Sequence, residues 1–293
     1  MHYRRFAMER EHAYLAFDVG GTKLAAGVVT VEGRVLVRDR VPTPSREPWR
    51  ASAALLRRVL AAVHGVDVVA CGVACGGPMS PGGEQVSPLH IPAWRGFELK
   101  RNIVELTGLP TFVDNDAKAL VLAERWLGAA RGAENCMAVV VGTGVGGGIV
   151  LDGRLLGGRL GNAGHIGHVV VEPDGLPCAC GGRGCLEAYI CGPAVRAETG
   201  RPPSRAPLAI MERNGRLLGR AVASVVALLD LPLTVVGGSV ALGFGAPFFD
   251  AAQQELSERA RLAFAAGSLI RPVGLGADGS LVGAAALVHE AVG

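Results

Sequence analysis

The sequence is poor in lysine and aromatic residues, and it contains no long apolar run. Lysine accounts for only 3 of the 29 basic residues in a chain of 293, and the net charge is +3, so the charge favours neither nucleic acid nor an anionic membrane as a partner. No segment reaches the roughly 18 consecutive apolar residues that a membrane-spanning helix needs. The charged residues before position 13 do not resemble a signal peptide, so we expect a cytoplasmic protein that starts at Met1 or Met8.

Glycine, in contrast, is abundant, with 43 residues, which is about twice the average frequency. The length predicts one or two domains, and a hydrophobic content of 49% is sufficient for a large buried core. Because the glycines are clustered, their positions indicate tight turns at which backbone atoms can approach a ligand closely.

The pattern of apolar residues predicts an α/β protein with mixed sheets. Strands are expected at Tyr14–Asp18, Leu24–Thr30, Arg34–Arg38, Val66–Ala74, Thr111–Val113, Cys136–Val141, Gly148–Leu151 and Thr234–Val236, and helices at Arg50–His64 and Ala117–Leu127. The first three strands form a predicted antiparallel meander. Two strand–glycine–strand patterns, at Leu15–Val29 and Ala138–Val150, suggest two related lobes that each present a glycine turn to a shared cleft.

These two glycine turns are candidates for phosphate binding. In Asp18–Lys23 the backbone N–H groups can approach an anion, Thr22 can donate a hydroxyl, and Asp18 can orient a hydrated Mg²⁺, although a plain tight hairpin also uses such glycines. The segment Gly142–Gly147 contains a formal G-x-G-x-x-G match. A dinucleotide-binding fold would need a helix next, and a strand is predicted there instead. No P-loop motif is present, so we expect phosphates to be held between the two lobes.

A short acidic segment, Asp114-Asn115-Asp116, precedes the helix predicted at Ala117–Leu127. Such residues often cap a helix, because their side chains accept hydrogen bonds from its first N–H groups. Two carboxyl groups that flank an asparagine exceed what a cap requires. A carboxylate is also the group that phosphoryl transfer to an alcohol needs as a base.

Three of the seven cysteines crowd into one segment with a nearby histidine, in the pattern H-x9-C-x-C-x4-C. The four residues are His168, Cys178, Cys180 and Cys185. One imidazole and three thiolates fill a tetrahedral Zn²⁺ shell without an open position, which is typical of a structural site. Free thiols or a Cys180–Cys185 disulfide are the alternatives. The other cysteines, Cys71, Cys75, Cys136 and Cys191, are predicted to pack in the core.

Taken together, these motifs resemble those of the ROK family of sugar kinases and repressors, and the resemblance covers nearly the whole chain. It rests on the segments Asp18–Lys23, Asp114–Ala117, Gly142–Gly147 and Gly164–Glu187. The resemblance implies a two-lobed actin-like ATPase (ribonuclease H-like) fold with a central cleft and a zinc knuckle. The implied N-terminal lobe is 1–116, completed by a helix at about 280–293, and the implied C-terminal lobe is 117–279, with the zinc segment and an oligomerisation surface.

The same resemblance implies the roles of individual residues. ATP and Mg²⁺ would be bound by Asp18, Gly20, Gly21, Thr22, Lys23, Gly142, Thr143, Gly144 and Gly238, the last in a turn that a plain strand-to-helix connection would also explain. The sugar would be bound by Gly77, Asn115, Asp116, His165, His168 and Glu187. Asp116 would accept the proton of the sugar 6-hydroxyl. One nitrogen of His168 would bind zinc, and the other would point at a sugar hydroxyl.

The sequence does not identify the sugar substrate, because two segments favour different sugars. Glucose-specific members carry glutamate where this chain has His165, whereas a bacterial N-acetylmannosamine kinase carries histidine there. An imidazole can donate a hydrogen bond to an amide carbonyl, whereas a carboxylate cannot, which favours an N-acetylated sugar. The alternative is that His165 does not contact the sugar and only supports residues that do. Against this, Pro88–Phe97 resembles the glucokinase members, and His90 stands where many members carry asparagine.

We therefore expect an ATP-dependent kinase for the 6-hydroxyl of a hexose or an N-acetylhexosamine, with N-acetylmannosamine favoured and glucose as the alternative. A repressor of the same family is disfavoured because the 17 residues before Asp18 are too few for a DNA-binding domain. A non-catalytic sugar sensor is disfavoured because Asp116 and both glycine turns are retained. Family members are dimers or tetramers, so we expect a homodimer or a homotetramer.

Overall fold

A computed structural model describes residues 11–276 and 278–292. Its contacts divide the chain into two compact units: Met1–Asn115 with Asp278–Gly293 form unit 1, and Asp116–Ala277 form unit 2. The sequence predicted that the first stretch of unit 1 ends at residue 116, which is one residue later than the contacts place it. The two possible start sites, Met1 and Met8, lie outside the described residues. The central cleft and the oligomerisation surface stay predictions.

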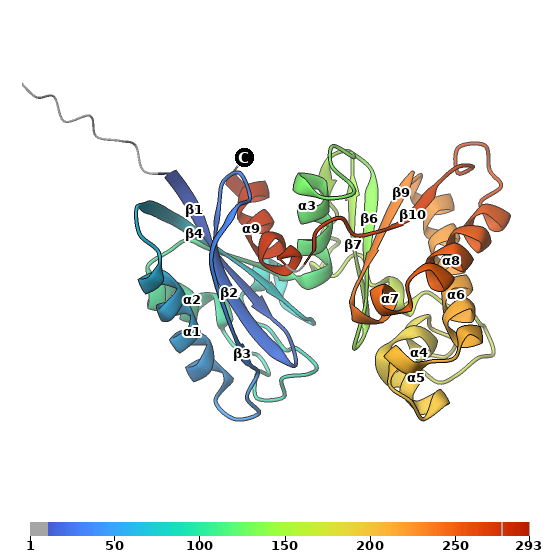
Figure 1. Ribbon diagram of the computed structural model, residues 1–293, viewed down its shortest axis with the longest axis horizontal. Coiled ribbons are helices and arrows are strands. Elements are labelled where there is room, and N and C mark those ends of the chain that lie inside the picture. The colour runs from blue at the N-terminus through green and yellow to red at the C-terminus, as the bar shows by residue number, and fades with distance from the viewer. Residues whose placement is uncertain (1–10, 277, 293) are drawn as a thin grey trace, which may run out of the picture. The chain divides into compact units, whose positions relative to one another are not determined.

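Unit 1 contains a five-stranded sheet with the strand order β3-β2-β1-β4-β5 (Figure 1). Its strands are β1 (Glu11–Val19), β2 (Lys23–Thr30), β3 (Val35–Pro42), β4 (Val66–Cys75) and β5 (Thr111–Asn115). Strands β1, β2 and β3 form the predicted antiparallel meander, and β4 and β5 run parallel to β1. The sheet is therefore mixed, which confirms the expectation from the sequence.

Helices cover the sheet of unit 1. They are α1 (Pro48–Ala62), α2 (Leu99–Thr107) and α9 (Gly279–Val292), with a short 3₁₀ helix, η1 (Pro81–Gly83). Helix α1 packs against β2 and β3, whereas α9 packs against β1 and β4. A Cβ atom built on Gly72 of β4 would lie 1.8 Å from the carbonyl oxygen of Ala284, so only glycine lets α9 approach this closely.

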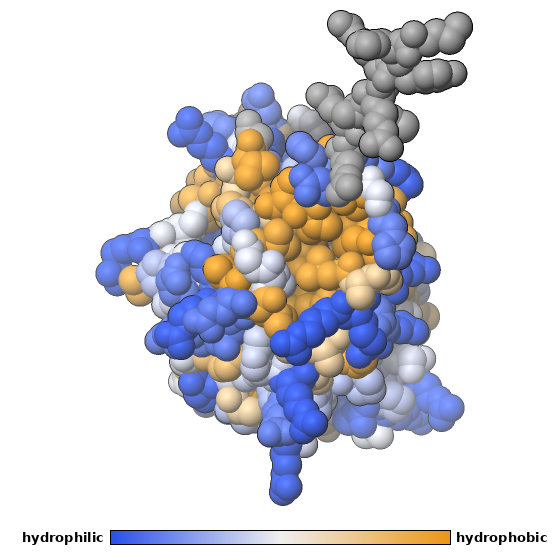
Figure 2. All heavy atoms as spheres, turned by 90° about the vertical axis from the view of Figure 1, so that its left-hand side faces the viewer, coloured by the Kyte–Doolittle hydropathy of each residue, from blue (hydrophilic) through white to orange (hydrophobic). Residues whose placement is uncertain are grey.

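The outer strand β3 presents polar groups to solvent. Arg38 and Arg40 are exposed on it, and the strand ends at Pro42, which has no N–H to donate. These features discourage another chain from adding a strand at this edge. Figure 2 shows one end of unit 1, where hydrophilic residues surround a hydrophobic patch.

Unit 2 contains a second five-stranded sheet, with the order β10-β9-β6-β7-β8. Its strands are β6 (Cys136–Val141), β7 (Val145–Leu151), β8 (Arg154–Leu155), β9 (Leu233–Gly237) and β10 (Leu269–Pro272). Its helices are α3 (Asp116–Leu127), α4 (Glu187–Ile190), α5 (Gly192–Thr199), α6 (Leu208–Leu229), α7 (Ser239–Phe244) and α8 (Ala246–Arg259), with the 3₁₀ helices η2 (Ile166–His168) and η3 (Pro203–Arg205).

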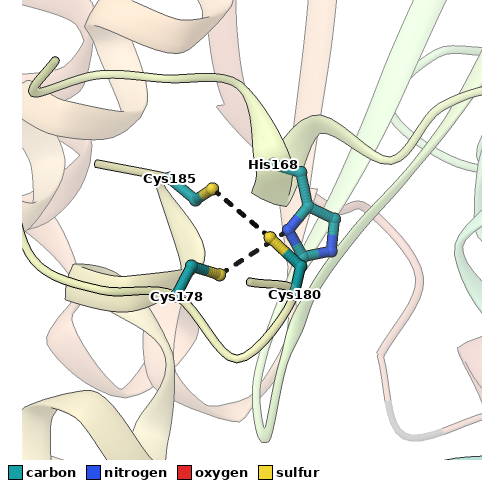
Figure 3. A group of neighbouring side chains, drawn as sticks. All are labelled: His168, Cys178, Cys180 and Cys185. Atoms are coloured by element: carbon teal, nitrogen blue, oxygen red, sulfur yellow. Dashed lines mark hydrogen bonds between the residues drawn. The ribbon is translucent and has the colours of Figure 1, made fainter. Parts of the chain in front are cut away.

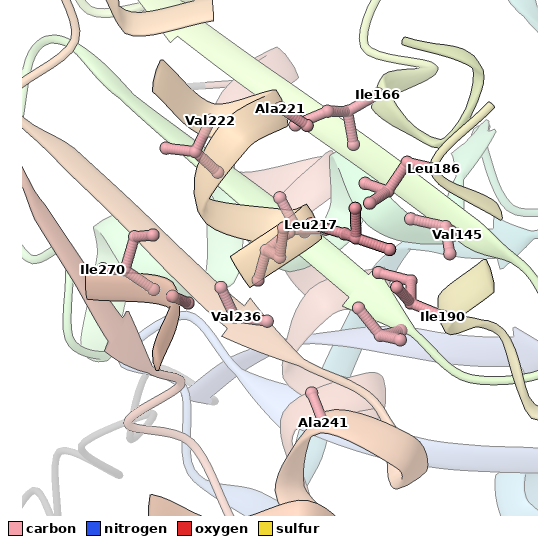
Figure 4. Close-up of a cluster of buried hydrophobic side chains, with 14 of the residues drawn as sticks. Val145, Ile166, Leu186, Ile190, Leu217, Ala221, Val222, Val236, Ala241 and Ile270 are labelled. Carbon is pink, nitrogen blue, oxygen red and sulfur yellow. The ribbon is translucent and has the colours of Figure 1, made fainter. Parts of the chain in front are cut away.

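One buried apolar cluster joins the sheet of unit 2 to its helices (Figure 4). Side chains from β7, β9, α6 and α7 meet in it, together with residues on both sides of the cysteine-rich segment. Two glycines of α6 lie against α8: Cβ atoms on Gly215 and Gly219 would lie 2.2 and 2.3 Å from the carbonyl oxygens of Phe248 and Ala252. These glycines let the two helix backbones approach more closely than side chains would allow.

The predicted glycine loop at Gly142–Gly147 is wrong in its extent. Strand β7 begins at Val145 rather than Gly148, so the turn is only Gly142–Gly144. A Cβ atom on Gly148 would lie 2.6 Å from the carbonyl oxygen of Ala117, and one on Gly147 would lie 2.5 Å from that of Gly164. The later glycines are thus needed for the close packing of α3 and a neighbouring loop on the strand. The other predicted strands and helices match to within a few residues.

Among residues 11–276 and 278–292, no helix combines the length and the apolar character that crossing a membrane would require.

Candidate active site

In unit 1, several predicted site residues lie at the carboxyl ends of the parallel strands. Asp18 of β1 is in register with Ala74 of β4, and Cys75 is in register with Asn115 of β5. The carboxyl ends of parallel strands meet at one edge of a sheet, where ligands commonly bind. A Cβ atom on Gly77 would lie 3.7 Å from Nδ2 of Asn115, so the structure brings these two predicted sugar-binding residues together.

The first glycine turn, between β1 and β2, is closed by its own backbone and by the chain after β3. The N–H of Gly20 donates to the carbonyl of Lys23 over 3.0 Å. The hydroxyl of Thr43 donates to the carbonyl of Gly20 over 2.7 Å, and the N–H of Thr43 donates to the carbonyl of Thr22 over 3.1 Å. The turn residues themselves are exposed from Gly21 to Lys23, as a ligand-binding turn requires.

Two residues beside this turn have functions that the sequence analysis did not assign. Thr43 holds the turn through its hydroxyl, and nothing in the sequence pattern around it indicates this. His90 lies against the turn, because a Cβ atom on Gly21 would be 2.5 Å from the Cβ atom of His90. Glycine at position 21 therefore leaves room for the loop that carries His90.

The acidic segment lies at the junction of β5 and α3. Asn115 ends the strand and Asp116 is the first residue of the helix, with an exposed side chain. Oδ1 of Asp116 accepts the N–H of Ala117 at 2.9 Å, and Oδ1 of Asp114 accepts the N–H of Asn115 at 2.7 Å. A carboxylate at this position lies at the positive end of the helix dipole, which stabilises its charge.

The second glycine turn, in unit 2, connects β6 to β7. The N–H of Gly142 donates to the carbonyl of Gly144 over 2.9 Å and closes the turn. The N–H of Gly192, at the start of α5, donates to the carbonyl of Gly142 over 2.8 Å. Gly238 has a φ of 94°, and its Cβ atom would lie 2.3 Å from the carbonyl oxygen of Val141, so the end of β9 lies directly beside this turn.

The side chain of Glu187 reaches the same turn from the beginning of α4. Its Oε2 accepts the N–H of Val145 at 2.7 Å. A Cβ atom on Gly144 would lie 2.9 Å from this oxygen, so glycine leaves the space that the carboxylate occupies. The structure thus joins a residue predicted for the sugar to the turn predicted for the nucleotide.

Four charged or titratable groups surround His165. Its ring is stacked on that of His168, with centroids 6.2 Å apart. Burial and the neighbouring His168 and Lys118 lower the pKa of His165, against the opposing effects of the Glu187 and Asp116 carboxylates. His165 is therefore neutral at pH 7. Four predicted sugar-binding residues of unit 2, namely Asp116, His165, His168 and Glu187, are thus brought together.

Lys118 is a site-adjacent residue that the sequence analysis missed. Its side chain is only 2% exposed, and Nζ donates to the carbonyl of Gly161 over 2.7 Å. The hydrogen bond ties the loop before His165 to the first turn of α3, two residues after Asp116. A lysine is almost never fully buried without a partner, so the burial of Lys118 indicates a structural function. This burial cannot be predicted from the sequence.

The four predicted metal ligands also lie together (Figure 3). The ligand atoms of His168, Cys178, Cys180 and Cys185 are all within 4.8 Å of one another. Nδ1 of His168 lies 3.8 Å from Sγ of Cys178, and Sγ of Cys180 lies 3.8 Å from Sγ of Cys185. Zinc with sulfur ligands at about 2.3 Å in a tetrahedron would place those sulfur atoms about 3.8 Å apart, so the cluster fits this ion.

The backbone around the cluster is folded to hold these ligands. Within the cysteine-rich segment, Gly184 has a φ of 71°, and its Cβ atom would lie 1.7 Å from the carbonyl oxygen of Glu172, so no other residue fits there. Arg220 of α6 donates to the carbonyl of Val171 at 3.0 Å and forms ion pairs with Glu172 and Glu255. The cluster is thereby fixed to the helical layer of unit 2.

The remaining cysteines, Cys71, Cys75, Cys136 and Cys191, are buried and form no disulfides. Burial raises the pKa of Cys136 to about 11 against the opposing charge of Arg125, and it raises the pKa of Cys71 further. The thiols of Cys71 and Cys136 are therefore protonated at neutral pH, and all four buried cysteines pack as small side chains.

A model of the ROK family matches residues 14–291. An N-acetylmannosamine kinase from Yersinia pseudotuberculosis is 36% identical over 250 residues, which cover 79% of this chain and 84% of that protein.

Two crystal structures show the same fold. A ROK hexokinase from Thermus thermophilus is 34% identical, with a TM-score of 0.79, over 94% of this chain and 97% of that one. A ROK family glucokinase from Streptomyces griseus, in complex with glucose and AMPPNP, is 30% identical, with a TM-score of 0.80. The match covers 94% of this chain and 98% of that one. The likeness confirms the predicted actin-like ATPase fold.

Proposed function

The chain belongs to the ROK family, and from this membership we propose that it is an ATP-dependent sugar kinase that phosphorylates the 6-hydroxyl of an N-acetylhexosamine, with N-acetylmannosamine as the preferred sugar. Sugar kinase activity is supported by the curated relative and by the two kinases of known structure. The observation that carries the proposal is the convergence of Asp116, His165, His168 and Glu187 in unit 2.

Asp116 is the base in this proposal. Transfer of a phosphoryl group to an alcohol needs a hydroxyl in line with the γ-phosphate, a group that accepts its proton, and donors or cations that absorb the charge on the phosphate oxygens. Asp116 is exposed at the start of α3, where its carboxylate can accept the proton of the 6-hydroxyl. Asn115 and Gly77 would hold neighbouring hydroxyls.

The two glycine turns would bind the phosphates of ATP. The N–H groups of Gly20 and Gly142 close the turns internally, so we assign these glycines to turn shape. Phosphate binding falls to the exposed residues that follow them, such as Thr22 and Thr143. Asp18, at the strand end, is the carboxylate that suits a hydrated Mg²⁺, and this ion would neutralise charge on the phosphates.

Zinc has a structural function in this proposal. Its one imidazole and three thiolates leave no position for a substrate, so the ion would fix the backbone around His168 and Cys185 rather than take part in the reaction. With Nδ1 of His168 directed at the sulfur atoms, the other ring nitrogen is the one that would bind the sugar.

The preference for an N-acetylated sugar depends on His165. A neutral imidazole carries one N–H, which can donate to the carbonyl of an acetamido group. Glucose is a second candidate, because a hexokinase and a glucokinase of known structure are each at least 30% identical to this chain. A dimer or tetramer stays a prediction.

A sugar panel tests both the reaction and the substrate. The protein is incubated with ATP, Mg²⁺ and N-acetylmannosamine, N-acetylglucosamine, mannose or glucose, and ADP release is coupled to NADH oxidation. We expect the highest kcat/KM for N-acetylmannosamine and a 6-phosphate product by ³¹P NMR. A preference for glucose would contradict the proposed substrate but not the proposed reaction. Absence of ADP release with every sugar would contradict the proposed kinase activity.

Asp116→Asn tests the base. General base catalysis contributes about 10²- to 10⁴-fold, so we expect kcat to fall by about 10³-fold while sugar affinity, measured by calorimetry, changes little. Asp114→Asn is the matched control, since its amide oxygen can still accept the N–H of Asn115. Near-normal turnover in Asp116→Asn would show that another group accepts the proton.

A further inference from the structure

We propose that Glu187 is also a positioning residue for the nucleotide, because its carboxylate holds the Gly142–Gly144 turn in shape. The inference rests on the proposed function and extends it: a residue assigned to the sugar would control the affinity for ATP before any sugar is bound. Three sets of contacts in unit 2 support it.

The first set is the direct contact between the carboxylate and the turn. Oε2 of Glu187 accepts the N–H of Val145 at 2.7 Å, at the point where the turn enters β7. The same oxygen occupies the space beside Gly144 in which a Cβ atom would be 2.9 Å away. A hydrogen bond to a charged acceptor is stronger than one between neutral groups, so this contact fixes one end of the turn.

The second contact fixes the other end of the turn. The carbonyl of Gly142 accepts the N–H of Gly192 at 2.8 Å. Glu187 and Gly192 are five residues apart, on α4 and at the start of α5, so one short stretch of chain holds both ends of the turn. The turn retains only one hydrogen bond of its own, from Gly142 to Gly144.

The third set is the apolar packing beneath the turn. Val145 belongs to the same buried cluster as Ile166, Leu186 and Ile190, and Figure 4 shows these side chains side by side. Ile166 lies two residues before the metal ligand His168, and Leu186 follows Cys185 directly. The base of the turn is therefore packed against both ends of the segment that carries the zinc ligands.

These contacts imply a coupling between the two ligands. A carboxylate has two oxygens, so Glu187 can hold the turn with one and accept a sugar hydroxyl with the other. A sugar that orders this side chain would then favour the turn geometry that binds phosphate. By linkage, the nucleotide would favour the sugar by the same factor.

The test uses two substitutions that separate the turn from the sugar. In Glu187→Gln an amide oxygen remains to accept the N–H of Val145, whereas Glu187→Ala removes the acceptor. Binding of AMPPNP with Mg²⁺ is measured by calorimetry in the absence of sugar. We expect about a tenfold loss of affinity in Glu187→Ala and less than about a threefold loss in Glu187→Gln. Both variants should bind sugar more weakly.

Glu198→Ala is the control, because it removes a carboxylate that pairs with Arg213 at the surface of the same unit. It should bind AMPPNP as the natural protein does. If Glu187→Ala keeps the full AMPPNP affinity while its sugar affinity falls, Glu187 acts on the sugar alone and the inference is overturned. If the natural protein binds sugar but no adenine nucleotide, the proposed phosphoryl donor is wrong and the inference is overturned with it.

A substitution in the turn tests the same contact from the opposite side, and it remains informative if Glu187→Ala does not fold. The new Cβ atom of Gly144→Ala would lie 2.9 Å from Oε2 of Glu187 and would displace the carboxylate. We expect sugar affinity to fall by about tenfold without any nucleotide present. Unchanged sugar affinity in this variant would contradict the inference.

Discussion

Two glycine turns that look alike in the sequence are held in place by different means. Both connect antiparallel strands and both are predicted to bind phosphate. The turn of unit 1 is held by Thr43, which follows the adjacent strand β3. The turn of unit 2 is held by Glu187 and Gly192, which follow the predicted zinc ligands in the chain. Similar local sequences therefore depend on different parts of the molecule.

The sheets explain this difference. In unit 1, β3 runs beside the whole length of β2, and the pairing of Lys23 with Pro42 brings Thr43 to the turn. In unit 2, β8 has only two residues, and its ladder with β7 covers Val150 and Leu151, at the end away from the turn. Near the turn, the backbone around Gly164 and Gly167 packs closely against β7 instead. The second turn is thus supported by Glu187 and Gly192, which follow the His168–Cys185 cluster in the chain, rather than by residues next to a paired strand.

The strongest test of this comparison is removal of the metal cluster. Loss of a structural zinc typically costs much of a small domain's folding energy, so we expect Cys178→Ser to lower kcat/KM by more than about 100-fold and to lower the melting temperature clearly. Mass spectrometry of the native protein should find one zinc per chain. Cys136→Ala is the matched control, a buried thiol outside the cluster. A fully active protein without zinc would show that the metal does not support the turn of unit 2.

A smaller effect is expected from Thr43→Val, which removes the hydroxyl that donates to Gly20 but keeps the side chain's shape. A lost hydrogen bond of this kind costs about 1 kcal/mol, so KM for ATP should rise by about fivefold. Zinc content and sugar affinity should stay unchanged, because unit 2 is untouched. Thr43→Ser keeps the hydroxyl and should behave as the natural protein. A change in zinc content in Thr43→Val would contradict the separate support of the two turns.

The smallest effect is expected from Gly146→Ala in β7. The new Cβ atom would lie 3.3 Å from that of Ala117, which a slight shift of α3 can accommodate, so the free energy of unfolding should fall by about 1 kcal/mol or less. KM for ATP should not change, since Gly146 lies in the strand rather than in the turn. A large rise in KM would show that the binding turn extends to Gly146, as the sequence had suggested. Denaturant titration and steady-state kinetics measure both effects.

Much of the fold could be predicted from the sequence, because strand and helix periodicity are local. The mixed sheets and the fold class follow from that periodicity and from the family motifs. The length of the second glycine turn could not be predicted. Gly146 and Gly147 are typical of a loop in the sequence, and their pairing with Val140 and Val139 of β6 shows that they belong to a strand.

The same limit applies to the candidate site. The clustering of His168, Cys178, Cys180 and Cys185 could be predicted because their spacing is itself a local pattern. The contacts of Thr43 and Lys118 could not be predicted. Each side chain donates to a backbone carbonyl that is far away in the sequence. The contact of Glu187 with Val145 spans 42 residues, and no spacing rule indicates it.

The chain order of unit 1 has a consequence for how the protein is made. Strands β1 and β4 are covered by α9, which is synthesised after all of unit 2. At about 5–20 residues per second, the roughly 160 intervening residues take about 8–32 s to emerge from the ribosome. During that interval the nascent sheet keeps an apolar face exposed to chaperones and to other nascent chains. Truncation of α9 would make this aggregation-prone state permanent.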